Sequence, residues 1–357
     1  MTAVRRGTEA GAPVAFVESP VQFLNVLEWA HAGGARPEVV VLSPVDPMSR
    51  GQLRRIAGLA RDEGYTVRWQ DAREDGVAVL QALRELGPLI SRAERVVVGD
   101  PFSRYVQLLL ALFGARRLTV VDDGTATLEY LAQLARGERL VRWHRRRGRG
   151  PRELALAPVA ALARRRLAPG RDREVEVFTA LPVEAAPEGT VITENRFAWT
   201  RSRLGPPRLT EGADLVGTSL VETGVVDLDR YTAAVGALAV AHGGRRYFAH
   251  RRESAEKLHR IAVETGLEIV RPDLPLELIA RRGPIARTVL SFPSTVVHTL
   301  PLVLAGDGVS IRVCPIDPEW LRSTVTDRAR GFLAGVADSA RAAHGIPFTG
   351  TPRAAEA

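Results

Sequence analysis

Two adjacent carboxylates, Asp122 and Asp123, follow the apolar run Leu118–Val121 and precede Gly124. Neighbouring carboxylates at the end of a buried strand raise each other's pKa, so one of them can act as a general base towards a hydroxyl group. A plainer interpretation stays open, in which Asp123 or Thr125 only caps the helix that follows.

A second candidate group lies in the stretch YFAHRRE, where His250 ends a β-like run and Arg251 and Arg252 follow it. Two guanidinium groups can hold an anion such as a departing phosphate, and an imidazole can donate a proton to it. A structural histidine is the alternative.

Hydroxyl groups form a third candidate site in SFPST, where Ser294 and Thr295 precede a helical stretch. Hydroxyls and free backbone N–H groups at the N-terminus of a helix bind phosphate readily. An ordinary helix cap explains the same residues equally well.

Polar residues also follow two other expected strands of the first half of the chain. Ser19 and Gln22 come after the first strand, and Gly99 and Asp100 come after the fourth. Ligands of open α/β sheets bind beyond the carboxyl ends of the strands, so we expect these residues to face the same cleft as Asp122. Each of them could instead be an ordinary loop residue.

Short apolar runs alternate with helical periodicity along most of the chain. The expected strands are residues 13–18, 38–43, 66–70, 95–100, 118–123, 175–181, 190–195, 213–220, 245–250, 267–272, 288–293 and 309–314. Strands without polar alternation, separated by amphipathic helices, are typical of parallel sheets covered on both faces. The expected fold class is α/β, with an N-terminal Rossmann-like domain at 1–136, an Arg-rich linker or amphipathic segment at 137–185, and a C-terminal Rossmann-like domain at 186–357.

The net charge of +8 belongs to one segment of the chain. Residues 136–173 contain 13 arginines and three acids, a net charge of +10, so the remainder is slightly acidic. A charge this local argues against nucleic acid as the partner. The segment could instead contact an anionic acceptor or anionic lipid headgroups.

Composition excludes several other classes of protein. The single cysteine, Cys314, rules out a disulfide framework and fits a cytoplasmic location. We expect neither a signal peptide nor a membrane-spanning helix, because no apolar run is long enough. The seven histidines show no zinc-like spacing, so no metal site is expected. ESPVQF stands where a GxGxxG fingerprint would follow the first strand, so a conventional dinucleotide site is not expected either.

Taken together and in order, these motifs resemble those of a family of bacterial sialyltransferases. The family includes lipooligosaccharide sialyltransferases and capsular polysialyltransferases, which carry an acidic–acidic–Gly motif, a His–Pro motif and a Ser–Ser/Thr motif. In this chain they stand as Asp122-Asp123-Gly124, His250-Arg251 and Ser294-Thr295. The resemblance covers roughly residues 13–315, and it departs from the family at Arg251, where the family has proline.

The resemblance implies a metal-independent, inverting GT-B transferase that uses CMP-sialic acid and has two domains facing a central cleft. It implies that Asp122 is the general base, supported by Asp123, and that His250 is the general acid or a phosphate ligand. It further implies that Ser294 and Thr295 bind the CMP phosphate, with Arg251 and Arg252 beside it. No cofactor is expected apart from the CMP-sugar donor.

The expected acceptor is a glycan or glycolipid of the cell surface, and residues 136–173 could hold the protein at the inner face of the membrane. Two alternatives stay open. One is a transferase for another CMP-linked nonulosonic or ulosonic acid, which Arg251 in place of the family's proline keeps open. The other is a non-catalytic relative that uses the basic segment to bind an anionic glycan or membrane. The sequence does not fix the acceptor, the linkage, the number of sugars added or the oligomeric state.

Overall fold

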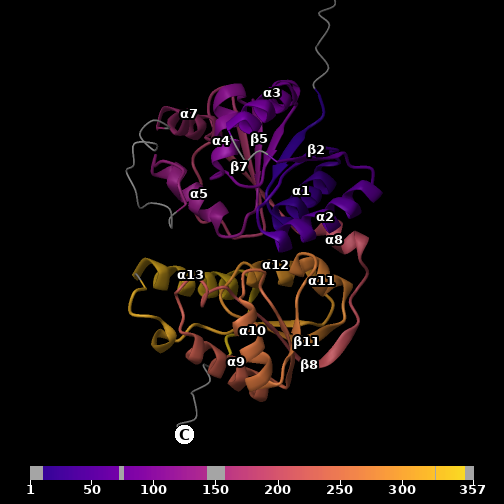
Figure 1. Ribbon diagram of the computed structural model, residues 1–357, viewed down its shortest axis with the longest axis vertical. Coiled ribbons are helices and arrows are strands. Elements are labelled where there is room, and N and C mark those ends of the chain that lie inside the picture. Colours follow the sequence, from indigo (N-terminus) through magenta and orange to yellow (C-terminus); the bar gives the residue numbers. More distant parts are fainter. Residues whose placement is uncertain (1–10, 72–75, 143–156, 326, 350–357) are drawn as a thin grey trace, which may run out of the picture. The chain divides into compact units, whose positions relative to one another are not determined.

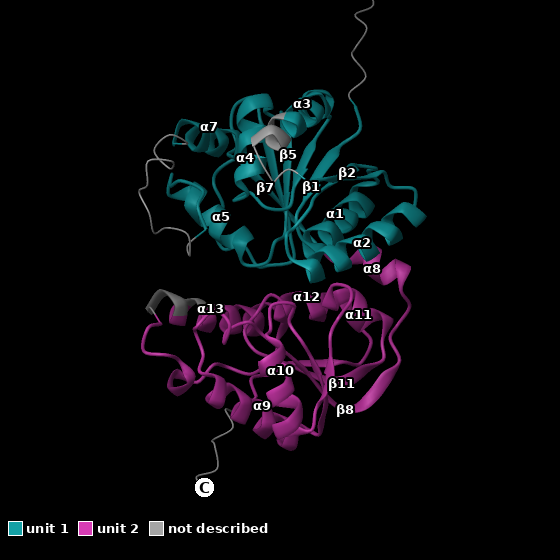
Figure 2. Ribbon diagram, viewed as in Figure 1, with its two compact units in different colours: residues 1–195 teal, residues 196–357 magenta. Residues whose placement is uncertain are grey.

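The computed structural model of the chain describes residues 11–71, 76–142, 157–325 and 327–349. Two compact units divide the chain between Asn195 and Arg196 (Figure 2). Each unit contains one sheet with helices packed around it (Figure 1). The units are described separately below.

The first unit is built on a seven-stranded parallel sheet in the order β3-β2-β1-β4-β5-β6-β7. Its strands are β1 (Val14–Val17), β2 (Glu38–Leu42), β3 (Val67–Gln70), β4 (Val96–Val98), β5 (Arg117–Val121), β6 (Glu174–Thr179) and β7 (Thr190–Glu194). Its helices are α1 (Pro20–Gly33), α2 (Pro47–Asp62), α3 (Gly76–Arg92), α4 (Arg104–Phe113), α5 (Ala126–Ala135) and α7 (Ala157–Leu167).

Valine runs make the central strands of this sheet. All residues of β1 and β4 are buried, as expected for strands covered by helices on both faces. β-branched side chains fit this pleated environment well. The strand order reverses between β1 and β4, which makes their carboxyl ends the usual ligand site of a Rossmann-like sheet.

The boundary between the units differs from the sequence prediction. Strands β6 and β7 lie within 137–185 and 186–357, yet both complete the sheet of the first unit. Helix α7 packs against α4, and Ala163 and Leu167 are fully buried. The described part of the Arg-rich segment therefore belongs to the first unit rather than forming a linker. Residues 143–156, which contain five of its 13 arginines, lie outside the described residues.

The second unit is built on a five-stranded parallel sheet in the order β10-β9-β8-β11-β12. Its strands are β8 (Leu209–Val216), β9 (Gly244–Phe248), β10 (Glu268–Val270), β11 (Ile285–Ser291) and β12 (Ser310–Val313). Its helices are α8 (Ala198–Arg203), α9 (Leu228–His242), α10 (Ala255–Thr265), α11 (Leu276–Arg282), α12 (Val296–Val303), the short 3-10 helix η2 (Pro318–Trp320) and α13 (Asp327–His344).

The twelve expected strands all form, and the predicted class of two Rossmann-like parallel-sheet units is confirmed. The ends shift by a few residues, most at β8, which begins at Leu209 rather than at residue 213. In the second sheet the order reverses between β8 and β11. The carboxyl ends of those two strands are therefore the corresponding ligand edge of this unit.

Candidate active site

Seven of the predicted site residues gather at the ligand edge of the first unit. Ser19 and Gln22 follow β1, Gly99 and Asp100 follow β4, and the triplet 122–124 follows β5. These three strands are neighbours in the sheet. The structure thus brings together residues that are about a hundred positions apart in the chain.

Asp122 is buried, with 4% of its surface exposed. Its Oδ1 accepts a hydrogen bond of 2.6 Å from the Thr179 hydroxyl, and its Oδ2 accepts one of 2.7 Å from the Ala180 N–H. Burial raises the pKa of Asp122 from 3.8 to about 6, although hydrogen bonds from Thr179, Ala180 and Thr127 oppose the rise. A carboxylate accepts about four hydrogen bonds, which leaves one position for an incoming hydroxyl.

Asp123 pairs with an arginine that the sequence motifs did not identify. The Arg142 guanidinium lies 2.5 Å from Asp123 and 3.0 Å from Asp100, so it bridges the two carboxylates. Burial and the neighbouring Asp100 raise the pKa of Asp123, while Arg142 and a hydrogen bond from Gln22 lower it. Arg142 thus offsets the repulsion between two carboxylates at the same edge.

The alternative that Asp123 or Thr125 only caps the next helix is not supported. Thr125 occupies the N-cap position of α5 but makes no side-chain capping bond. The Asp123 carboxylate faces Arg142, and its N–H donates to the Thr127 hydroxyl. Gly124 completes the turn into α5 with φ of 67°.

Ser19 and Gln22 make local hydrogen bonds at the ligand edge of the first unit. The Ser19 hydroxyl caps α1 by accepting from the Gln22 N–H, so its first role is local. The Gln22 Oε1 accepts from the Glu18 N–H at 2.7 Å. A Cβ atom on Gly99 would lie 2.5 Å from the Gln22 Oε1, so this close approach requires glycine.

Replacing Arg142 should make the stability of the first unit depend on pH. In Arg142→Gln the Asp100 and Asp123 carboxylates lose their shared cation, so the folded-state pKa of Asp123 rises further. A raised folded pKa means that stability is lost as pH increases. We expect the denaturant midpoint of the variant to lie below wild type at pH 8 and to approach it at pH 5. Arg139→Gln, at an exposed position, is the control, and equal midpoint losses at both pH values would contradict the prediction.

The second unit carries His250 in the loop after β9. The His250 Nδ1 accepts a hydrogen bond of 3.2 Å from the Arg252 N–H, so a neutral ring carries its proton on Nε2. Burial, together with the positive charges of Arg251, Arg252 and Lys257, lowers the pKa of His250 to about 4. At neutral pH the ring is therefore an uncharged hydrogen-bond donor. Arg251 is half-buried and Arg252 is exposed.

Ser294 and Thr295 stand between the end of β11 and the start of α12. Both residues are half-buried, and the Ser294 Oγ lies 3.5 Å from the Ser291 Oγ. Thr295 is at the N-cap position, but its side chain makes no capping hydrogen bond. The ordinary-cap alternative is therefore not supported for Thr295. Because β11 borders the reversal of strand order, these hydroxyls lie at the ligand edge of the second unit.

Several residues at the ligand edges of the two units were not identified by the sequence motifs. Thr179 and Arg142 lie in the segment interpreted as a linker or amphipathic segment, and the contacts of Asp122 with Thr179 and Ala180 span 57 and 58 residues. Glu253 stands inside the YFAHRRE stretch but was assigned no role. A signal for Lys257 was present, because it is the single lysine of the chain.

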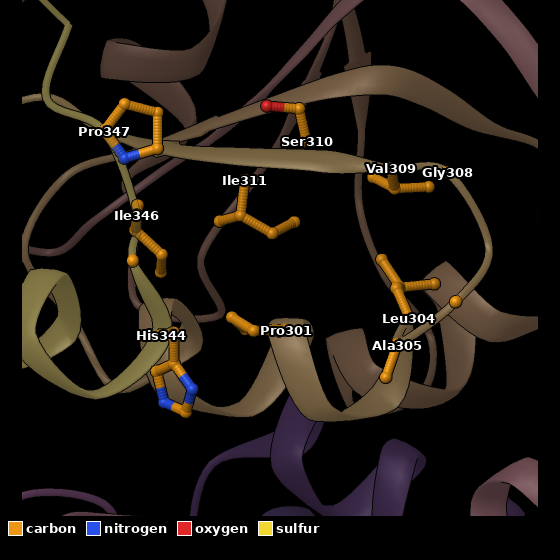
Figure 3. A pocket seen from close by; sticks show the side chains of 12 residues that line it. Pro301, Leu304, Ala305, Gly308, Val309, Ser310, Ile311, His344, Ile346 and Pro347 are labelled. Atoms are coloured by element: carbon orange, nitrogen blue, oxygen red, sulfur yellow. The ribbon is translucent and has the colours of Figure 1, made fainter.

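The two edges are distinct from the pockets at the other ends of the strands. A pocket of about 270 Å³ is lined by the end of α12, the start of β12 and residues 344–347 (Figure 3). His250, Ser294 and Thr295 do not line it. Within the described parts of the chain, no group of three or more His, Cys, Asp or Glu residues is placed to hold a metal ion.

Comparisons with known proteins give the following similarities. No family model matches the sequence, and no curated protein matches it either. A provisionally assigned UDP-N-acetylglucosamine 2-epimerase from Listeria monocytogenes is similar in structure, with a TM-score of 0.49, 11% identity, and coverage of 86% of this chain and 79% of that one.

Two sugar transferases are also similar. For the E. coli heptosyltransferase WaaC with ADP the TM-score is 0.38 and the identity 14%, over 92% of this chain and 99% of that one. For a UDP-glucosyltransferase from Polygonum tinctorium the TM-score is 0.43 and the identity 14%, over 95% of both chains. Similarities of this size do not assign a substrate.

Proposed function

We propose that the protein is a glycosyltransferase of the GT-B class that transfers sialic acid from CMP-sialic acid to a hydroxyl of a cell-surface glycan, with inversion at the anomeric carbon. One observation carries the proposal. A carboxylate with a raised pKa lies at the ligand edge of one Rossmann-like unit, and a neutral histidine beside two arginines lies at that of the other. The order of the motifs along the chain agrees with the family resemblance.

The proposed roles follow from these geometries. Asp122 takes the proton of the acceptor hydroxyl, whose oxygen forms the new bond to the anomeric carbon. The bond from that carbon to the phosphate oxygen breaks, and CMP leaves with its electron pair. The His250 Nε2–H donates a hydrogen bond to the departing phosphate, with the Arg252 guanidinium as a nearby cation. Ser294 and Thr295 bind the same phosphate through hydroxyl and backbone N–H groups.

Asp123 and its neighbours support the base without taking the proton. The negative charge of Asp123 contributes to the raised pKa of Asp122. The bridge from Arg142 fixes Asp123 and Asp100 in place. The mechanism needs no cofactor beyond the CMP-sugar, because the sialyl anomeric centre is tertiary and tolerates a cation-like transition state.

The proposed setting is the inner face of the cell membrane. The exposed Arg165 of α7, with the half-buried Arg164 and Arg166 beside it, would contact anionic headgroups or an anionic acceptor. Within the described residues, no helix is long and apolar enough to cross a bilayer.

The purified protein should release CMP from CMP-Neu5Ac, with water as acceptor if no glycan is present. We expect release in the wild type and a release about 10²- to 10³-fold lower from His250→Ala. Release that persists unchanged in both His250→Ala and Asp122→Ala would contradict the proposal. Absence of release together with absence of CMP binding in calorimetry would also contradict it.

A second candidate is a transferase for another CMP-linked nonulosonic or ulosonic acid. It is favoured by Arg251, which replaces the family's proline beside the histidine. CMP binding without release from CMP-Neu5Ac would select this candidate, and thermal stabilisation by related CMP-sugars would then identify the donor. A non-catalytic relative would bind a glycan or membrane but release CMP from none of these donors.

A further inference from the structure

The chain contains a single lysine among 49 lysine and arginine residues, and this lysine is buried. Lys257 belongs to the first turns of α10, and only 1% of its side chain is exposed. A buried ammonium is costly unless it is paired and hydrogen-bonded. The groups around Lys257 therefore indicate which structural role its charge has.

Lys257 is surrounded by acceptors from three segments of the second unit. Its Nζ lies 2.6 Å from the Glu253 Oε1 and donates to the Thr218 carbonyl oxygen at 2.7 Å. Glu222 lies 3.5 Å away, and the Nζ sits 4.0 Å from the centre of the Tyr231 ring. These contacts tie the start of α10 to the loop that follows β8.

Glu253 connects Lys257 to the backbone of His250. Its Oε1 accepts from the Tyr247 hydroxyl at 2.6 Å, and its Oε2 accepts from the His250 backbone N–H at 2.6 Å. The carboxylate is fully buried in this network. A Cβ atom on Gly217 would lie 2.3 Å from the Glu253 Oε2, so Gly217 leaves the space that this carboxylate occupies.

An arginine would not fit in place of the lysine. The Nζ has three donors and contacts Glu253, Thr218 and Glu222, whereas a guanidinium has five donors in a rigid plane. The other 48 lysine or arginine positions of the chain are all arginine, and the single lysine stands where a compact cation with three donors meets these acceptors.

We propose that Glu253 and Lys257 are positioning residues for His250, holding its backbone so that Nε2 is presented at the ligand edge for the donor phosphate. The proposal rests on the proposed function for the role of His250. Burial raises the pKa of the Glu253 carboxyl and the Lys257 ammonium opposes that rise; the ammonium also orients the carboxylate, which fixes the His250 N–H. Neither residue needs to touch the substrate.

Glu253→Gln separates this role from general stability. A carboxamide has one oxygen and one NH2 group, and the Lys257 ammonium, which has only donors, requires the oxygen, whereas the Tyr247 hydroxyl can accept as well as donate. The NH2 group then faces the His250 N–H, two donors meet, and that hydrogen bond is lost. We expect the His250 amide to exchange with solvent about tenfold faster or more in Glu253→Gln. Amide exchange followed by NMR measures this directly, without any substrate.

Two further variants provide the control and the rescue. Glu222→Gln removes a carboxylate beside the same ammonium but leaves the His250 bond, so the exchange of the His250 amide should match wild type. In Glu253→Gln/Lys257→Met no ammonium holds the oxygen, the carboxamide can turn, and protection should return. Unchanged exchange in a folded Glu253→Gln protein would overturn the proposal, and so would a double variant that exchanges faster than the single one.

If Glu253→Gln does not fold, the test compares two double variants in which both buried charges are removed. Glu253→Gln/Lys257→Met keeps an acceptor near the His250 N–H, whereas Glu253→Leu/Lys257→Met has none. Faster exchange in the second than in the first supports the proposal, and equal exchange overturns it.

Activity provides the separate readout. With CMP-sugar turnover established, Glu253→Gln should lower kcat for CMP release more than it raises KM, since a misplaced donor acts mainly on the departing phosphate. A rise in KM with unchanged kcat would overturn the positioning role. If no turnover is found at all, the exchange experiment still decides the placement of His250, so failure of the proposed function is told apart from failure of this inference.

Discussion

Asp122→Asn should lower CMP release by about 10²- to 10⁴-fold while making the protein more stable at pH 8. The loss of turnover follows because an amide cannot accept the acceptor's proton. The substitution fits the fold, since the Asn oxygen can accept from the Ala180 N–H and its NH2 group can donate to the Thr179 hydroxyl.

The gain in stability has a definite dependence on pH. The pKa of Asp122 is about 6 in the folded protein against a reference value of 3.8, so the folded state binds the proton more tightly. Stability is therefore full below pH 4, falls as pH rises towards 6, and stays reduced above it. The ionised form costs on the order of 3 kcal/mol, which the neutral Asn avoids.

Chemical unfolding of wild type and Asp122→Asn at pH 4, 6 and 8 checks this prediction. The midpoint difference should grow with pH, whereas the exposed Asp62→Asn should show no such growth. A variant that is less stable than wild type at pH 8 would show that the buried charge stabilises this edge instead.

His250→Ala should lower kcat/KM for CMP release by about 10²- to 10³-fold, the usual cost of removing one hydrogen-bond donor from a developing charge. His259→Ala is the matched control, because His259 is exposed on the next helix, α10. Equal activity of the two variants would remove His250 from the mechanism.

The pH profile of the wild type distinguishes a neutral donor from a charged acid. Since the pKa of His250 is about 4, the ring is already neutral above pH 5. We expect kcat/KM to rise as pH passes the pKa of Asp122, about 6, and then to stay level to pH 8. A fall between pH 6 and 7.5 that vanishes in His250→Ala would mean that the imidazolium is the active form.

The sequence predicts strands more reliably than it predicts which sheet they join. Runs such as Val96–Val98 show their buried character directly in the amino acids. The assignment of β6 to the first sheet depends instead on pairing with β5, whose residues lie more than fifty positions earlier. The Arg-rich stretch between β5 and β6 resembles a linker in its charge and glycine content. Its composition therefore does not indicate that the chain continues in the same sheet after it.

The same distinction applies to the site. Asp122, His250 and Ser294 are recognisable, because a reactive side chain directly after an apolar strand is a local pattern. Arg142 and Thr179 are not, because their importance lies in contacts with residues distant in the chain. Glu253 is adjacent to a motif, yet its function depends on a buried ammonium that no periodicity reveals.

The position of β6 and β7 late in the sequence of the first unit has a consequence for folding during synthesis. During synthesis the first five strands leave the ribosome well before Thr179 and Ala180 can reach Asp122. The amide of Asn195, the last residue of the unit, donates to the Asn25 side chain in α1 at 2.9 Å. Until Thr179 and Ala180 emerge, the Asp122 carboxylate lacks these hydrogen-bond donors, and β5 is an unpaired edge strand that can pair with other chains. We therefore expect a nascent chain of 136 residues to be prone to aggregation, and the sheet edge that carries Asp122 to be among the last parts of the first unit to form.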